Sequence, residues 1–235
     1  MPPAPIIALI PAYNAAHLIG PVIEAAGRHL PVTVVDDGST DGTAAAAEAA
    51  GARVIRQRPN QGKGVALRNG FQHALSENCE AVLTLDADGQ HDPAEIPKFL
   101  EAYRARGADL IIGYRDFDAM PLSRKLANKS GTTAFSWALG EPIRDNQSGY
   151  RLIRRRLMDA THASGESGFE FEVEMIVLCV QHGYRLDWVP IRTIYAGAGS
   201  HIRPVEHVVN FLRVVWKTWR TMATHRDARA GLSGS

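Results

Sequence analysis

The sequence predicts a single α/β domain in which helices cover both faces of a mixed, mostly parallel central sheet. In the first half of the chain, short apolar runs alternate with longer segments of helical periodicity, the pattern of buried parallel strands joined by helices. No linker rich in Pro, Gly or Ser divides the 235 residues. Apolar residues make up 45% and charged residues 22%, so the composition is that of a folded globular chain and excludes a disordered or fibrous protein.

The strands of the first half are predicted from apolar runs that end at turn-forming residues. Ile6–Ile10 is ended by Pro11, and Val32–Val35 by a run of Asp, Gly, Ser and Thr. The alanine-rich run Thr43–Ala50 is expected to form a helix with Asp41 as its N-cap. The other elements expected before residue 120 are helices at Ala16–Arg28, Gly64–Leu75 and Ala94–Arg106, and strands at Arg53–Arg56, Ala81–Leu85 and Asp109–Ile112.

The second half of the chain is expected to complete the sheet and to build the other wall of a cleft outside the carboxyl ends of the strands. A helix at Leu122–Trp137 leads to a polar loop, Gly140–Gly149. Further expected elements are a strand at Tyr150–Ile153, a helix at Phe171–Gln181, strands at Arg185–Val189 and Ile191–Tyr195, and a helix from Val205 to Thr224. We divide the chain into a main region 1–204 with halves 1–120 and 121–204, a C-terminal amphipathic helix 205–226 and a tail 227–235.

Charge and cysteine usage exclude several classes of protein. Lys and Arg number 26 against 25 Asp and Glu, so nothing global favours nucleic acid as a partner. Cys79 and Cys179 lie too far apart for a zinc motif and form no disulfide framework, which suits a reducing compartment. No apolar stretch approaches the roughly 18–20 residues that span a bilayer, and the first residues lack the basic segment of a signal peptide. We expect a cytoplasmic protein that could lie peripherally on the inner face of the cell membrane.

An acidic cluster, Leu-Asp-Ala-Asp-Gly-Gln, follows the third buried run of the first half. Side chains two apart in an extended segment point the same way, so Asp86, Asp88 and Gln90 are expected to converge. Two carboxylates and an amide oxygen suit Mg²⁺ or Mn²⁺. These acids could instead only cap the next helix, but Asp92 already suffices for that role. The cluster therefore predicts a metal site.

Two other strand ends carry groups suited to a nucleoside. Asp36 and Asp37 follow the second strand, where a carboxylate can accept hydrogen bonds from a base N–H or from ribose hydroxyls. Turn chemistry alone would also account for these acids. Tyr13 follows the first strand and offers an aromatic face for a base.

Together these clusters carry a resemblance. The motifs IPAYN, VVDDGSTDGT, NQGKG, LDADGQHDP and DNQSGYR occur in the order seen in family 2 glycosyltransferases, and the chain most resembles the dolichol- and polyprenol-phosphate sugar transferases of that family from about Ile6 to Pro204. The resemblance implies a GT-A-like (Rossmann-like) fold. It also implies inverting, metal-dependent transfer of a sugar from a GDP-mannose or UDP-glucose type donor to a polyprenyl or dolichyl phosphate, with Mg²⁺ or Mn²⁺ as cofactor.

The resemblance also assigns residues. The chain departs from the family pattern at Ala15, where an acid is common, and at Asn128, where a serine is expected. It departs also at His201, because the family has a lysine after the serine that corresponds to Ser200. The implied nucleotide-sugar residues are Pro11, Tyr13, Asp36, Asp37, Lys63, Asp86 and Ser200, and the implied metal ligands are Asp86, Asp88 and Gln90. The implied catalytic residues are Asp145, Asp88, Arg115 and Arg124, and those for the acceptor phosphate are Arg115, Arg124 and Asn128.

Several alternatives stay open at this point. Asp145 would orient a phosphate acceptor, whereas for a saccharide or lipid hydroxyl acceptor it would be the general base. Arg115 and Arg124 favour phosphate, because guanidinium groups match phosphate geometry. Lys63 could be a solvated loop lysine instead of a nucleotide contact. A nucleotidyltransferase would usually show a glycine-rich phosphate loop soon after the first strand, and this chain has Pro-Ala-Tyr-Asn-Ala-Ala there. A catalytically silent nucleotide-sugar-binding partner subunit is a further alternative, although intact Asp86, Asp88 and Asp145 argue against it.

Two more segments allow two interpretations each. Glu172 lies in an acidic stretch and could contact the acceptor or belong to a solvated face at a helix start. The C-terminal helix could lie in a membrane interface, or its apolar face could pack on the domain or on a second copy of the chain. That apolar face comprises Val208, Phe211, Leu212, Val215, Trp219 and Met222.

Overall fold

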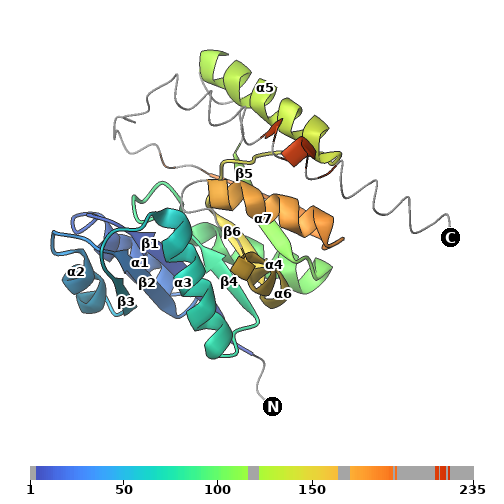
Figure 1. The fold of residues 1–235 in the computed structure, drawn as a ribbon. Helices are drawn as coiled ribbons and strands as arrows, with labels where there is room; N and C mark the ends of the chain where they lie inside the picture. The colour runs from blue at the N-terminus through green and yellow to red at the C-terminus, as the bar shows by residue number, and fades with distance from the viewer. Residues whose placement is uncertain are drawn as a thin grey trace.

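The computed structural model describes residues 4–115, 122–163, 170–192, 194, 215–216, 218–220 and 222, and for residues 122–130 and 163 it describes the backbone alone. Its strands are β1 (Ile6–Ala12), β2 (Val32–Asp37), β3 (Arg53–Gln57), β4 (Ala81–Thr84), β5 (Leu110–Arg115), β6 (Arg151–Arg154) and β7 (Leu186–Ile191). Its helices are α1 (Ile19–Gly27), α2 (Thr43–Ala49), α3 (Lys63–Ser76), α4 (Ile96–Arg106), α5 (Leu122–Leu139), α6 (Arg155–Ala160) and α7 (Glu170–Gln181), with 3₁₀ turns at Pro93–Glu95 and Thr161–Ala163 (Figure 1).

The strands form one seven-stranded sheet in the order β3-β2-β1-β4-β6-β5-β7. Every neighbouring pair is parallel except the two that involve β6, which runs antiparallel to both β4 and β5. The structure thus confirms the expected mixed, mostly parallel α/β domain.

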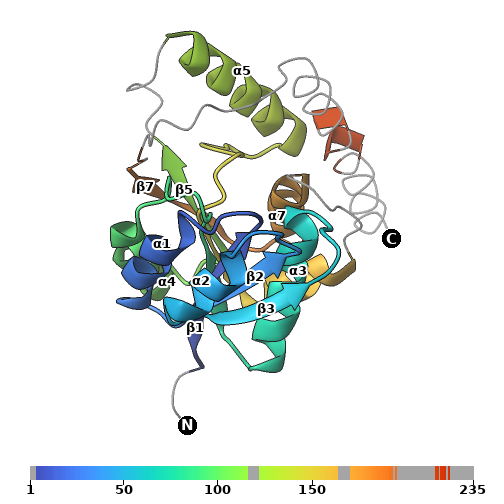
Figure 2. The ribbon, with the colours of Figure 1, turned by 90° about the vertical axis from the view of Figure 1, so that its left-hand side faces the viewer.

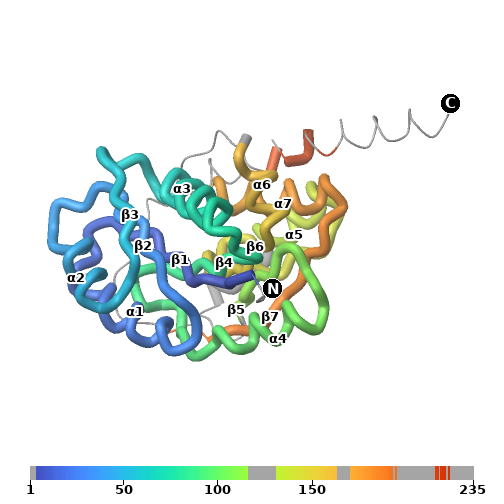
Figure 3. The backbone as a smooth tube through the Cα atoms, turned by 90° about the horizontal axis from the view of Figure 1, so that it is seen from below, coloured from blue at the N-terminus to red at the C-terminus, as the bar shows by residue number. Residues whose placement is uncertain are grey.

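Helices cover both faces of this sheet (Figures 2 and 3). One hydrophobic cluster packs α1, α2 and α4 against one face, and a second packs α3, α6 and α7 against the other. All six residues of β2 are buried, because a strand covered on both sides has no solvent-facing side. In α1 the buried residues recur at helical spacing, at Ile19, Val22, Ile23 and Ala26, so one stripe of that helix faces the sheet.

The reversed direction of β6 decides which segments meet at the functional end of the sheet. Arg151, the first residue of β6, lies opposite Thr84 at the end of β4 and Ile112 in β5. The amino end of β6 and the loop before it therefore join the carboxyl ends of β1, β2, β4 and β5 at one edge. Helix α5 lies beyond this edge, at the end of the molecule away from the N-terminus (Figures 1 and 2).

Three expectations about individual elements need correction. The break expected between strands at Arg185–Val189 and Ile191–Tyr195 is absent, because β7 continues through Pro190 to Ile191, and an edge strand tolerates the missing N–H of proline. Residues 193 and 195 of the second expected strand lie outside the described residues. Helix α6 directly after β6 was not expected. The N-cap position of α2 is Gly42 and not Asp41, although the Asp41 carboxylate still accepts a hydrogen bond from the Thr43 N–H at 2.9 Å.

No helix in the described part of the chain combines the length and the apolar character needed to cross a membrane.

Candidate functional site

The sequence-predicted nucleoside residues lie at the ends of β1 and β2. Pro11 is buried within β1 opposite Val35, and Tyr13 follows the strand with 51% of its surface exposed. Asp36 is buried, and its Oδ1 accepts a hydrogen bond from the Ser39 N–H at 3.3 Å. An exposed aromatic ring and a buried carboxylate therefore stand at the ends of two adjacent parallel strands.

The carboxylate of Asp37 anchors the loop that leads into α3. It accepts hydrogen bonds from the backbone N–H groups of Gln61 and Gly62, both at 2.8 Å, and from the side-chain amide of Gln57. A carboxylate offers about four lone-pair sites, so most of the accepting capacity of Asp37 is used within the chain. Its role toward a nucleoside stays a prediction.

Lys63, Asp86 and Glu172 form an ion-paired cluster that joins both halves of the chain. The Nζ atom of Lys63, the first residue of α3, lies 2.6 Å from Oδ1 of Asp86 and 3.1 Å from Oε1 of Glu172. Burial opposes the charge of Lys63, but the two carboxylates outweigh burial and raise its pKa above the usual value. Burial likewise disfavours the Asp86 carboxylate, yet the charge of Lys63 lowers its pKa to about 2.

This cluster corrects two alternatives raised from the sequence. Lys63 is not a solvated loop lysine, because its side chain is held between two carboxylates. Glu172 is not part of a solvated face, because only 4% of its surface is exposed. Gly149 packs directly on the cluster: a Cβ at this position would lie 2.8 Å from Glu172 Oε1 and 3.0 Å from Lys63 Nζ. The sequence placed Gly149 in the loop but gave no sign of this contact.

His91 supports the backbone of Asp86. Its Nδ1 atom accepts a hydrogen bond from the Asp86 N–H at 3.0 Å, and its ring packs 5.0 Å from the ring of Tyr150. Burial lowers the pKa of His91 despite the nearby negative charge of Asp86. The imidazole is therefore neutral, with its proton on Nε2, and it positions Asp86 through the main chain instead of through an ion pair.

The convergence expected for Asp86, Asp88 and Gln90 rested on an extended segment, and the structure has a turn there. Strand β4 ends at Thr84, and Gly89 has a φ of +75°, which favours glycine. Asp88 is exposed, and its Oδ1 accepts a hydrogen bond from the Gln90 N–H at 2.9 Å. The sequence argument assumed that these side chains alternate along an extended segment, and that assumption was wrong.

The donor set still fits a divalent metal bound together with a diphosphate. Asp88 offers an exposed carboxylate at the edge of the sheet, while the charge of Asp86 is balanced by Lys63. The described residues contain no cluster of three or more His, Cys, Asp or Glu suited to a metal ion. Mg²⁺ usually takes one or two protein carboxylates and completes its shell with phosphate oxygens and water, so a single well-placed aspartate satisfies that mode.

Arg115 and Asp145 form a doubly hydrogen-bonded ion pair in the other half of the site. Arg115 ends β5, and its Nε and Nη2 atoms donate to Oδ2 and Oδ1 of Asp145 at 2.7 and 3.1 Å. The Oδ1 atom also accepts a hydrogen bond from the Gln147 N–H at 3.0 Å, and 1% of the surface of Asp145 is exposed. Both oxygens of this carboxylate are therefore engaged inside the protein.

Several predicted site residues cannot be placed by their side chains. Arg124 and Asn128 lie in α5, four positions apart and so on one face of that helix, but their side chains lie outside the described part of the structure. Ser200 and most of the expected C-terminal helix also lie outside the described residues.

The described residues of the C-terminal segment are helical, and some of their side chains are buried while others are exposed. Val215 packs against the hydrophobic cluster under α3 and α7, and Met222 is buried in it. Trp216 and Trp219 are exposed, so Trp219 does not share the packed face to which the sequence pattern assigned it. Packing on the domain, one of the two interpretations of this helix, is thus confirmed for Val215 and Met222.

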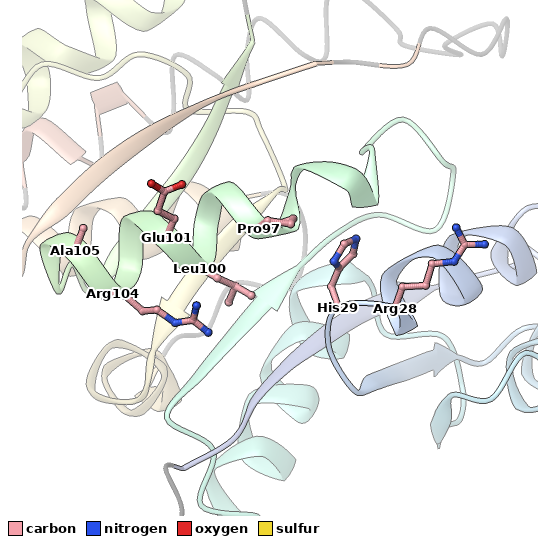
Figure 4. Close-up of a pocket in the computed structure, with 7 residues that line it drawn as sticks. All are labelled: Arg28, His29, Pro97, Leu100, Glu101, Arg104 and Ala105. Carbon is pink, nitrogen blue, oxygen red and sulfur yellow. The ribbon is translucent and has the colours of Figure 1, made fainter.

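A cavity of about 560 Å³ lies elsewhere, between the end of α1 and helix α4 (Figure 4). Arg28 and His29, which line it, precede β2, so the cavity belongs to the amino edge of the sheet. Ligands of open α/β sheets bind at the opposite, carboxyl edge. This cavity is therefore separate from the candidate site.

Arg151 is a buried cation of the site for which the sequence predicted no role. Arg151 is fully buried at the start of β6, directly beneath the loop that carries Asp145. The only sequence signal is a charged residue beside the apolar run of a short strand, within the DNQSGYR motif.

Comparison with known proteins gives one consistent family. Residues 7–161 match the family model described as Glycosyl transferase family 2. The chain is 32% identical to undecaprenyl-phosphate mannosyltransferase of Micrococcus luteus, over 83% of this chain and 86% of that relative. It is 30% identical to polyprenol monophosphomannose synthase of Mycolicibacterium smegmatis, over 79% of this chain and 76% of that relative.

Solved structures share the fold. Glucosyl-3-phosphoglycerate synthase of Mycobacterium tuberculosis in complex with phosphoglyceric acid matches with a TM-score of 0.69 and 21% identity, over 93% of this chain and 80% of the other. A structure of the same enzyme with Mn²⁺, UDP-glucose and phosphoglyceric acid matches with a TM-score of 0.68 and 22% identity, over 92% and 78%.

Proposed function

The chain belongs to glycosyltransferase family 2, and from this membership we propose that it transfers a sugar from a nucleotide sugar to the phosphate of a polyprenyl or dolichyl phosphate. Membership places the chain among the glycosyltransferases and sets aside the nucleotidyltransferase. The assay below separates an active enzyme from a silent partner subunit. The relatives named for transfer to polyprenol and undecaprenyl phosphate support the lipid phosphate as acceptor.

The pairing of Arg115 with Asp145 is the observation that carries the choice of acceptor. A general base needs a carboxylate oxygen that can take a proton, whereas both oxygens of Asp145 accept hydrogen bonds from Arg115 and Gln147. The geometry suits a carboxylate that orients a guanidinium group toward an anion. A phosphate acceptor fits this arrangement better than a hydroxyl acceptor does.

A phosphate monoester acceptor also removes the need for a base. Its second pKa is about 6, so it is largely dianionic at neutral pH and nucleophilic without proton transfer. In the proposed reaction the acceptor oxygen attacks the anomeric carbon as the nucleoside diphosphate leaves from the opposite face, which inverts the configuration. Arg115, and Arg124 from α5, would hold the acceptor phosphate, with Asn128 as a further contact.

The donor is proposed to lie over the ends of β1, β2 and β4. Tyr13, Asp36 and Asp37 would contact the nucleoside, with Pro11 beneath and Ser200 near the diphosphate. Lys63 would act through Asp86 at the ribose. Asp88, with Gln90, would hold Mg²⁺ or Mn²⁺, which when bound supplies Lewis-acid stabilisation of the departing diphosphate.

The lipid acceptor places the reaction at a membrane surface, and we propose peripheral contact on the cytoplasmic face. The exposed rings of Trp216 and Trp219 support this placement, because tryptophan favours the membrane–water interface. We keep the division proposed from the sequence, in which the C-terminal helix follows the catalytic region 1–204. Association with a second copy of the chain remains an alternative for the same helix.

The test is release of nucleoside diphosphate by the purified protein from GDP-mannose and a panel of UDP-sugars. Each donor is supplied with or without undecaprenyl phosphate, and with Mn²⁺, Mg²⁺ or EDTA. Release that requires both the metal and the lipid phosphate supports the proposal and identifies the donor. Metal-dependent release that the lipid leaves unchanged contradicts the proposed acceptor.

A further inference from the structure

Arg151 occupies the junction between the donor half and the acceptor half of the site. It is one of the largest fully buried side chains, at 0% exposure, and it opens the antiparallel strand β6 between β4 and β5. Its backbone pairs with Thr84, two residues before Asp86, and with Ile112, three residues before Arg115. No other position of β6 lies as close to the functional edge of the sheet.

The guanidinium group of Arg151 fastens two segments that carry acidic site residues. Its Nε donates to the carbonyl oxygen of Ser148 at 2.7 Å, its Nη2 to that of Asn146 at 3.2 Å, and its Nη1 to that of Glu172. Asn146 and Ser148 belong to the loop between Asp145 and Gly149, and Glu172 belongs to the first turn of α7. Three donors in one rigid plane therefore fix the loop against the helix.

The guanidinium group of Arg151 is buried without a direct hydrogen bond to a carboxylate among the described residues. Its hydrogen bonds there go to main-chain carbonyl groups. Burial lowers the pKa of Arg151, while the negative charges of Glu172, Asp145 and Asp86 oppose that effect. The group stays charged at neutral pH, because the usual pKa of arginine lies above about 12. A buried cation thus lies beneath three site carboxylates that belong to three separate segments.

We propose that Arg151 is a positioning residue that holds Asp145 and Glu172 in register with Asp86, so that the acceptor phosphate and the donor meet in a reactive geometry. The proposal rests on the proposed function, since it presumes that the two halves bind the two substrates. It assigns Arg151 no contact with either substrate. Displacing a reacting group by about 1 Å can cost about 100-fold in rate, so the expected loss lies in turnover and not in donor binding.

The test compares Arg151→Met and Arg151→Lys with a matched control, Arg155→Met. Arg155 also donates to main-chain carbonyl oxygens, those of Leu75 and Cys79, but at the amino end of β4, far from the site. Thermal unfolding, binding of GDP and UDP with Mn²⁺, and turnover with GDP-mannose or UDP-glucose and undecaprenyl phosphate are measured for each protein. All assays run below the lowest unfolding midpoint.

Both methionine variants should unfold at lower temperature, and only Arg151→Met should lose turnover, by about 100-fold, with nucleotide affinity within about threefold of wild type. Arg151→Lys keeps the charge but not the planar group, so it should recover part of the turnover. Equal losses in Arg151→Met and Arg155→Met would mean a purely structural role and overturn the proposal. If Arg151→Met does not fold, full turnover in Arg151→Lys overturns it equally.

A further readout separates this proposal from the proposed function. Hydrogen–deuterium exchange in the wild type and in Arg151→Lys reports on peptides covering residues 145–149 and 170–174, whatever the acceptor is. Faster exchange of both peptides in Arg151→Lys than in wild type, with wild-type exchange rates in Arg155→Met, supports the positioning role. This holds even if undecaprenyl phosphate is not the acceptor. Unchanged exchange in both peptides overturns it even if sugar transfer to the lipid phosphate is observed.

Discussion

Arg115 holds Asp145 by two hydrogen bonds, from Nε to Oδ2 at 2.7 Å and from Nη2 to Oδ1 at 3.1 Å. The pair ties the end of β5 to the loop before β6, so the acidic residue of the DNQSGYR motif acts on an arginine of the neighbouring strand. The direction of the guanidinium group is thereby set before any acceptor arrives.

Asp145→Asn keeps the shape of the side chain and removes the charge that orients Arg115. We expect kcat/KM for undecaprenyl phosphate to fall about 100-fold, because a charge-assisted hydrogen-bonded pair is lost, with little change in nucleotide affinity. Steady-state kinetics and nucleotide binding check this. A variant with wild-type kinetics would mean that the pair has no part in acceptor binding.

Lys63→Met should lower the free energy of unfolding by about 3 kcal/mol, because it removes the ammonium group that pairs directly with Asp86 and Glu172. A double-mutant cycle with Glu172→Gln should give a coupling energy of about 1–3 kcal/mol in urea unfolding. The matched control is Arg53→Met, which breaks the exposed pair with Glu77 and should cost less than about 1 kcal/mol. Comparable costs at the two pairs would contradict the structure.

Gly149→Ala tests the close contact between the loop and the ion-paired cluster. The added methyl group would lie within 3.0 Å of Lys63 Nζ and still nearer to Glu172, so the cluster must shift. We expect turnover to fall at least about 10-fold in a folded protein. Gly20→Ala is the control, because nothing lies within 4 Å of its Cβ position, and it should leave turnover unchanged.

Acid stability should depend on Asp109. Burial disfavours its charge, but the side chain of Arg156 and the Arg185 N–H outweigh burial and lower its pKa. A carboxyl group whose pKa is lower in the folded than in the unfolded state contributes stability above the unfolded value of about 3.9, and that contribution fades as pH falls through the folded value. Asp109→Asn should therefore be less stable than wild type at pH 7, with a smaller difference near pH 3, as measured by urea unfolding.

Asp88→Asn should abolish the increase in nucleotide affinity that Mn²⁺ provides. The exposed carboxylate of Asp88 is the group that we propose shares a metal with the diphosphate, and an amide is a weaker ligand for a hard cation. Calorimetry of GDP and UDP binding with Mn²⁺ or EDTA measures the effect. If Mn²⁺ strengthens binding equally in wild type and variant, the metal is held elsewhere.

The central parallel strands β1, β2 and β4 were predictable because they are buried on both faces. Continuous apolar runs such as Ile6–Ile10 mark such strands clearly, and the order of the strands along the chain places the polar residues that follow them at one edge. The prediction failed at Pro190, where an edge strand accepts a residue that usually ends one. It also missed α6, which is too short to show a helical period.

The contacts within the site were less predictable than its location. The direction of Asp88 depends on a turn at Gly89, and the alternation argument presumed a strand. The pairing of Lys63 with Glu172 joins residues from opposite halves of the chain, and local pattern carries no information about such a contact. The role proposed for Arg151 could not be predicted for the same reason, because it depends on main-chain carbonyl groups that the fold brings around its guanidinium group.

Strands β5 and β6 are direct neighbours in the sheet, although residues 116–150 separate them in sequence. The intervening segment, with α5 and the loop bearing Asp145, thus leaves the sheet and returns to it at the same edge. Because both ends of this segment are fixed by two adjacent strands, it forms a natural unit for exchange between related enzymes. On the proposed function, we expect such chimeras to change the choice of acceptor while β1, β2 and β4 keep the original donor preference.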